Sequence, residues 1–109
     1  MDEEFVIKRL DEINEIDIEF SKHAADNFTI RGFEKRDIIN ILKGTKGIVN
    51  IEYQPDDEKG RKYKVKFAKS HKYNFVVVIN ILNGKIRVVT FHLESAKRMK
   101  GVKKWLERK

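Results

Sequence analysis

Two histidines and two arginines in this chain have the chemical types needed for proton transfer and phosphate binding. His23 and Arg31 lie eight residues apart in a segment predicted to be helical, so both fall on one polar stripe together with Asn27. An imidazole on such a stripe could move a proton, and a guanidinium could bind a phosphate through its planar fork. The alternative, which the spacing by itself favours, is a solvated helix face.

The second pair, Arg87 and His92, lies in a predicted β-hairpin. Asn83-Gly84 between two β-branched apolar runs predicts a two-residue type I′ turn, which needs positive φ at both central residues. Pairing outward from this turn sets Asn80 opposite Arg87, either as a phosphate clamp or as an exposed polar pair. It also sets Phe75 opposite His92, which is then a general acid or base, or a histidine satisfied at the sheet edge. On this register Arg87 and His92 lie on opposite faces, and only His92 shares a face with the helix stripe if the helices pack there.

The charge of the chain is basic and unevenly spread. The 109 residues carry a net charge of +7, with −6 in residues 1–20, +7 in residues 21–96 and +6 in residues 97–109. Such a field favours an anionic partner, nucleic acid first, although a lysine-rich solubilising surface gives the same totals. Cysteine is absent, which excludes disulfides and thiolate chemistry, and the three histidines show no metal-ligand spacing. We therefore expect no metal and no other cofactor.

Hydrophobic periodicity predicts the elements that must position these side chains. Ser21 is expected to cap one helix at its start, and Gly32 to end it in the left-handed conformation. Helices are predicted over residues 2–14, 22–31 and 34–43, and a last helix over residues 95–109. Residues 16–20 are predicted to form a short strand or an extended lead-in, and longer strands are predicted over residues 49–54, 62–67, 73–82 and 85–93.

These elements segregate along the chain, which is typical of an α+β fold. We expect one domain over residues 1–109, with N-terminal helices packed on a four-stranded antiparallel β-meander, an acidic helical lead-in over residues 1–17 and a basic C-terminal helix over residues 95–109. One register stays open: the lysines of residues 61–68 lie beside either Val76 and Val78 or Phe75 and Val77. The acidic start predicts neither a signal peptide nor a membrane span, so a cytoplasmic location is expected.

The run from His23 to Phe33, HAADNFTIRGF, resembles the signature H-A-x-x-R-φ-x-x-R-G-φ of a small domain family, where φ is apolar. A G-R/K-Y segment, here Gly60–Tyr63, and a final hairpin of the VVV…VVT kind also fit, so the resemblance covers residues 18–93. The family is similar to the RelE/ParE and BrnT toxins of prokaryotic toxin–antitoxin systems. Position 27, an arginine in the signature, is asparagine here, so a cation is missing there or replaced.

The resemblance implies a RelE-like fold, metal-independent cleavage of RNA that is often ribosome-bound mRNA, and a cognate antitoxin as protein partner. It implies catalytic roles for four residues, with a histidine as base or acid and the arginines as phosphate stabilisers: His23, Arg31, Arg87 and His92. His92 is the favoured one. Further basic side chains would hold the phosphate backbone: Lys62, Lys64, Lys66, His71, Lys72, Lys97, Arg98, Lys103 and Lys104. The second hypothesis is a non-catalytic module that binds nucleic acid or another protein through the same basic face.

Overall fold

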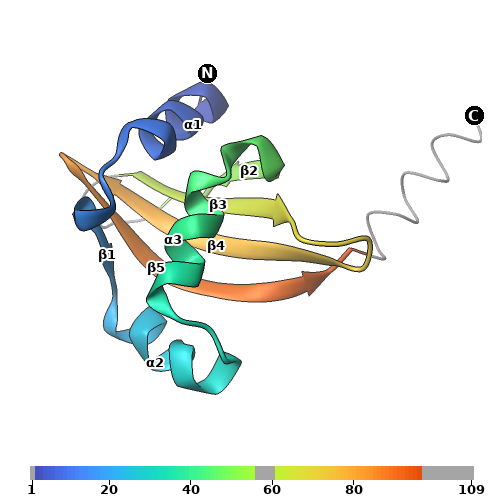
Figure 1. Ribbon diagram of the computed structural model, residues 1–109. Coiled ribbons are helices and arrows are strands. Elements are labelled where there is room, and N and C mark those ends of the chain that lie inside the picture. Colours follow the sequence, from blue (N-terminus) through green and yellow to red (C-terminus); the bar gives the residue numbers. More distant parts are fainter. Residues whose placement is uncertain (1, 56–60, 97–109) are drawn as a thin grey trace, which may run out of the picture.

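The computed structural model describes residues 2–55 and 61–96, and this part of the chain has an α+β fold (Figure 1). Its helices and strands follow one another as α1 (Asp2–Glu12), β1 (Ile18–Phe20), α2 (Lys22–Arg31), α3 (Lys35–Lys43), β2 (Ile48–Tyr53), β3 (Arg61–Ala68), β4 (Tyr73–Leu82) and β5 (Lys85–Ser95), with 3-10 turns at Glu15–Asp17 and Thr45–Gly47. The predicted boundaries agree within two residues for all three helices. The basic helix predicted over residues 95–109 lies outside the described residues beyond Ala96, and Ser95 is the last residue of β5.

The sheet has five strands in the order β1-β5-β4-β3-β2 and is mixed. Strands β2 to β5 pair antiparallel in chain order, as the sequence predicts. The four-stranded antiparallel meander nevertheless needs correction, because the extended lead-in forms β1 and pairs in parallel with β5, from Ile18 opposite Ile86 to Phe20 opposite Val88. Three residues are too short a run for the sequence to reveal a strand that pairs so far along the chain.

The β4–β5 hairpin follows the predicted register only near its turn. Ile79 lies opposite Val88, and the pairs toward the turn are also those predicted. Beyond Val88 the strand contains a β-bulge, because Val78 pairs with Thr90 and leaves Val89 as an extra residue. The turn type is also corrected: Gly84 has φ 75° and no described non-glycine residue has positive φ, so the turn is not type I′.

The open register between β3 and β4 takes the first of its two alternatives. Lys64 lies opposite Val78 and Lys66 opposite Val76. The aromatic and aliphatic residues of β3, among them Tyr63, then point to the other face, where they are buried. The lysine row therefore shares a face with the two valines.

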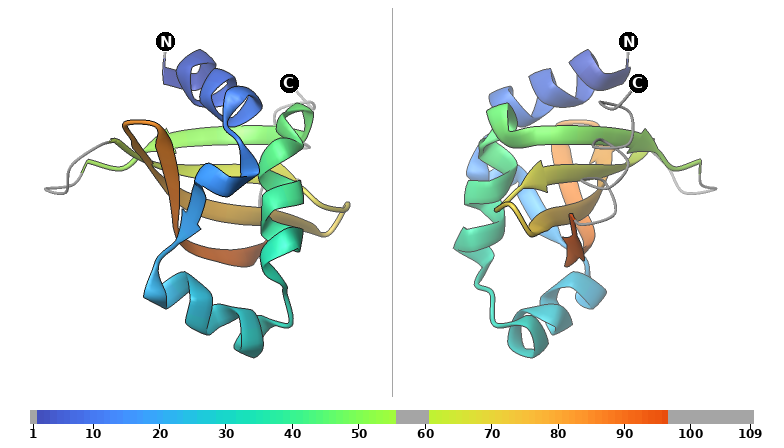
Figure 2. Two further views of the ribbon diagram at one scale, coloured as in Figure 1. Left: turned by 60° about the vertical axis from the view of Figure 1, so that its left-hand side comes forward. Right: turned by 90° about the vertical axis from the view of Figure 1, so that its right-hand side faces the viewer.

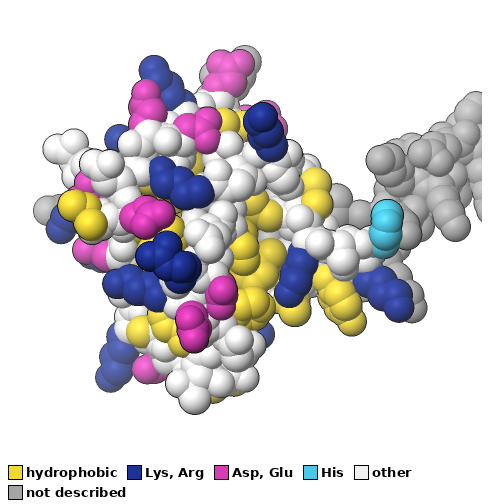
Figure 3. Space-filling model, in the orientation of Figure 1, with side chains coloured by type: hydrophobic (Ala, Val, Ile, Leu, Met, Phe, Trp, Pro, Cys, Tyr) yellow, Lys and Arg dark blue, Asp and Glu magenta, His cyan; other side chains and the backbone are white. Residues whose placement is uncertain are grey.

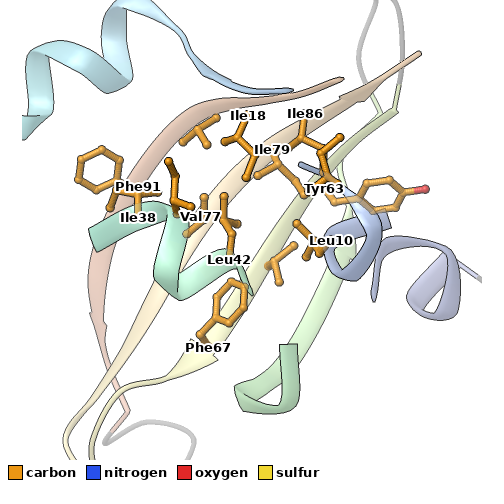
Figure 4. Packing of buried hydrophobic residues seen from close by; sticks show 14 of the residues in the cluster. Leu10, Ile18, Ile38, Leu42, Tyr63, Phe67, Val77, Ile79, Ile86 and Phe91 are labelled. Atoms are coloured by element: carbon orange, nitrogen blue, oxygen red, sulfur yellow. The ribbon is translucent and has the colours of Figure 1, made fainter. Parts of the chain in front are cut away.

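The helices gather on one side of the sheet (Figures 1 and 2). Helix α3 crosses the middle of that face, α1 lies toward β2, and α2 lies beyond β5, along the part of β5 that β1 does not reach. The core forms beneath α3, where Ile38 and Leu42 contact the sheet layer that includes Val77, and Leu10 of α1 joins near Tyr63 (Figure 4). No helix of the described residues covers the opposite face, which we call the open face of the sheet.

The helix side of the molecule carries charges of both signs and a patch of hydrophobic side chains beside α3, over the ends of β4 and β5 (Figure 3). Tyr73 and Leu93 are two large apolar residues exposed in these strands.

Helix α1 is fastened to α3 by Lys43, whose ammonium donates to the carbonyl oxygens of Leu10 (3.0 Å) and Ile13 at the C-terminal end of α1. None of the described helices is long and apolar enough to span a bilayer.

Candidate functional site

The bulge at Val89 decides which side chains of β5 reach the open face. Successive strand residues point to opposite faces, so one extra residue reverses the alternation for the rest of the strand. Arg87 before the bulge and His92 after it therefore lie on the same face, which corrects the prediction that they lie on opposite faces. The side chains that the pairing assigns to the open face are Asn50, Glu52, Lys62, Lys64, Lys66, Asn74, Val76, Val78, Asn80, Arg87, Thr90, His92 and Glu94.

Two buried valines form the centre of the open face. Val76 and Val78 are buried, yet neither belongs to the core cluster beneath the helices. In register, Lys66 and His92 flank Val76, whereas Lys64 and Thr90 flank Val78. Long side chains can cover apolar surface with their methylene stems while their charged ends stay in water. Val76 and Val78 are thus buried on a face that no helix of the described residues covers.

His92 lies half-buried on this face among cationic side chains. Burial lowers the pKa of its imidazole below the usual 6.5, and the positive charges of Arg31, Lys64 and Lys66 lower it further, whereas Glu94 acts in the opposite sense. The imidazole is therefore neutral at pH 7 and can accept a proton. Arg31 comes from the last turn of α2, which packs along β5 through the Phe28–Phe91 ring contact at 5.4 Å between centroids.

The stripe predicted on α2 is only partly polar surface. His23 is exposed, whereas Asn27 is buried and its amide nitrogen has no hydrogen-bond partner among the described residues. Of the predicted histidine–arginine set, the structure brings Arg31 within electrostatic reach of His92. No contact of the described residues joins His23 to either of them. The helix packs through Ala24 and Phe28 instead, and Ala25 is exposed.

Lys66 and Glu94 form an ion pair next to His92. The Lys66 ammonium lies 3.0 Å from Oε1 of Glu94, and the lysine side chain is only 17% exposed. The hydrogen bond from Lys66 is the main reason that the pKa of the Glu94 carboxyl is lowered, and a hydrogen bond with Asn74 adds to it. The charge of Lys66 is therefore already neutralised by Glu94. Lys66 is for this reason a poorer phosphate ligand than the sequence analysis predicts.

The Lys66→Met variant should make the fold less stable in a pH-dependent manner. Because the pKa of Glu94 is lowered by folding, its stabilising effect is complete above pH 4.5 and is lost as the pH falls through the folded value. We expect a lower urea midpoint than wild type at pH 7 and a smaller difference at about pH 3. Lys64→Met is the matched control, since Lys64 and Glu52 lie 3.9 Å apart at the surface, where ion pairs contribute little. A difference that is equal at both pH values would contradict this account of Glu94.

Arg87 is bound to a carboxylate from β1. Its Nε and Nη2 atoms lie 3.0 and 2.9 Å from Oε1 of Glu19, and Lys85 lies 3.8 Å from the other oxygen of the same residue. Asn80 does pair with Arg87 across the hairpin, as predicted. The guanidinium is nevertheless held by Glu19, a partner that the sequence did not indicate because the pairing of β1 with β5 was not predicted.

The other predicted phosphate ligands are dispersed. Lys62 and Lys64 lie half-buried on the open face, whereas His71 and Lys72 lie exposed in the loop between β3 and β4. The four remaining ones fall outside the described residues: Lys97, Arg98, Lys103 and Lys104. Among residues 2–55 and 61–96, no group of three or more histidine or acidic side chains could hold a metal ion.

The fold and this site define an α+β domain whose open sheet face carries a half-buried histidine among cations. The chain belongs to the family of domains of unknown function DUF4258, whose match spans residues 20–91 and so includes β5 as far as Phe91. No curated protein and no solved structure matches the chain significantly.

Proposed function

We propose that this protein is a RelE-like endoribonuclease that cleaves RNA on the open face without a metal ion, with His92 as general base. The observation that supports the proposal is the half-buried imidazole of His92 on the open face, flanking Val76 in register with Lys66, where burial and the charges of Arg31, Lys64 and Lys66 lower its pKa. General bases in enzymes are commonly imidazoles whose surroundings keep them unprotonated at the working pH. The resemblance of the run that begins at His23 to domains similar to the RelE/ParE and BrnT toxins points to the same class of activity.

The reaction proposed for this site transfers the phosphoryl group from the 5′-oxygen to the neighbouring 2′-oxygen of the same RNA strand. The imidazole of His92 takes the proton of a 2′-hydroxyl, and the 2′-oxygen then bonds to the adjacent phosphorus atom. The bond from phosphorus to the 5′-oxygen breaks, and that oxygen leaves with a proton from an ammonium group or from water. Negative charge that develops on the phosphate is stabilised by Arg31, whose guanidinium is exposed at the end of α2. Arg87 acts in this proposal through its pair with Glu19, which ties β1 to β5.

If the protein is a toxin of this class, we also expect a cognate antitoxin that covers the site.

A different candidate function, a non-catalytic module that binds nucleic acid or protein, is favoured by the ion pairs of the open face. Glu52, Glu94 and Glu19 each neutralise one cation on this face, namely Lys64, Lys66 and Arg87. A face with nearly balanced charge suits a protein partner better than a long phosphate backbone.

The deciding experiment incubates the purified full chain with single-stranded RNA in EDTA and follows both binding and cleavage. The endoribonuclease predicts discrete products ending in a 2′,3′-cyclic phosphate and binding that weakens steeply with salt. Lys64→Gln should weaken binding, whereas the control Lys46→Gln, in the turn before β2 on the helix side, should not. Binding without products would favour the non-catalytic module. If the protein neither binds nor cleaves RNA, whether ribosomes are present or absent, both functions on RNA are contradicted.

A further inference from the structure

Ser21 occupies the junction between β1 and α2 and bonds in two directions. Its backbone N–H donates to the carbonyl oxygen of Val88 at 2.9 Å. Its hydroxyl donates to the carbonyl oxygen of Val89, the bulged residue, at 2.8 Å. The same hydroxyl accepts from the backbone N–H of Ala24 at 3.1 Å, which makes Ser21 the N-cap of α2.

One hydroxyl group therefore joins the first turn of α2 to the bulge of β5. Only a group that donates and accepts at the same atom can make both bonds, which restricts the position to serine or threonine. Many residues suit an N-cap, including glycine, so the capping role alone would not require a hydroxyl. The bond to Val89 is what the hydroxyl adds.

The two elements that Ser21 joins carry the two halves of the site. His92 follows the bulge by three residues and reaches the open face because of it. Arg31 stands at the other end of α2, ten residues beyond Ser21, and its charge acts on His92. A shift of the bulge relative to the start of α2 would change the position of the imidazole relative to the guanidinium.

We propose that Ser21 is a positioning residue that fixes His92 relative to Arg31 by bonding the bulge of β5 to the N-terminus of α2. Its importance for catalysis rests on the proposed function, whereas the geometric claim does not. The charged groups that act on His92 come from three elements: Arg31 from α2, Lys64 and Lys66 from β3, and Glu94 from β5.

The test is an NMR titration of the His92 imidazole in the full chain, with Ser21→Thr and Ser21→Gly compared with wild type. Threonine retains both bonds, so the pKa of His92 should stay at the wild-type value. Glycine remains a good N-cap but loses the hydroxyl, so the pKa should shift upward toward 6.5 as the imidazole becomes more solvated and less influenced by Arg31. His71, in the exposed β3–β4 loop, is the internal reference, and circular dichroism verifies the fold.

Ser70→Ala is the matched control, since the Ser70 hydroxyl likewise makes two hydrogen bonds to the backbone, here accepting both from the N–H groups of Lys72 and Tyr73, but does not contact the bulge. A folded Ser21→Gly protein with an unchanged His92 pKa would overturn the proposal. If the protein also cleaves RNA, Ser21→Gly should lower the turnover by about 10²-fold while Ser21→Thr retains it. If cleavage is never found, the titration still decides the positioning role.

Discussion

Replacing His92 with alanine is expected to lower the rate of RNA cleavage by about 10²- to 10⁴-fold, the usual contribution of a positioned general base. The loss should appear in kcat, because the imidazole acts on the proton that moves during the reaction rather than on the bound phosphate. The acid limb of the wild-type pH profile should report the same group. Since the pKa of His92 is lowered from 6.5, the rate should rise through a value below pH 6.5 and level off above it.

His71→Ala is the matched control for this prediction, because it removes an imidazole from an exposed loop outside the sheet. Its kcat should stay within about twofold of wild type, because the phosphate-backbone contact predicted for His71 would change KM rather than the chemical step. A His92→Ala enzyme that cleaves at the wild-type rate would exclude His92 as the base. If the His92→Ala variant keeps the wild-type rate at its optimum but its acid limb moves to another pH, another group takes the proton.

Replacing Phe91 with alanine is expected to destabilise the fold by about 3–5 kcal/mol, the typical cost of removing a large buried ring. Phe91 is fully buried and links three parts of the molecule. Its ring centroid lies 5.4 Å from that of Phe28 in α2, 5.9 Å from that of Phe33 before α3, and 6.0 Å from that of Phe75 in β4. The variant should therefore loosen α2 and α3 from the sheet in one step.

Leu93→Ala provides the comparison, because Leu93 lies on the same face of β5 two residues later and is 39% exposed. Its removal should cost under about 1.5 kcal/mol, since part of its apolar surface stays in water in the folded state. Urea denaturation with a common slope measures both variants. Equal destabilisation by the two variants would mean that the aromatic cluster does not join the helices to the sheet.

Most of the local structure could be predicted from the sequence, because its signals lie within a few residues. Ser21 and Gly32 bound α2 as expected, with the serine hydroxyl at the N-cap and φ of 71° at the glycine. Alternation along β3 also separates its lysines from its buried residues correctly. Element order and the antiparallel pairing of neighbouring strands follow from such signals.

The features that the sequence did not reveal depend on distant partners. The bulge leaves no trace in the pattern, because Val88 and Val89 are both apolar and either could face the core. Because the bulge was missed, Arg87 and His92 were assigned to opposite faces, whereas they lie on the same face. Likewise the bond between Glu19 and Arg87 requires knowing that β1 pairs with β5. The prediction that His92 shares the helix-covered face with the α2 stripe is also wrong, because the bulge puts His92 on the open face, where the charge of Arg31 still acts on it.

The parallel pair of β1 and β5 has a consequence for the order in which the protein can fold. Glu19 and Arg87, which face each other in that pair, are separated by 68 residues. Contacts this distant close large loops and slow the folding of small domains, whereas the antiparallel hairpins can form locally. During synthesis the N-terminal helices emerge first, and β1 has no strand to join until β5 has left the ribosome. The site on β5 is thus completed last, so a chain interrupted before this strand would contain the helices and the lysine row without His92.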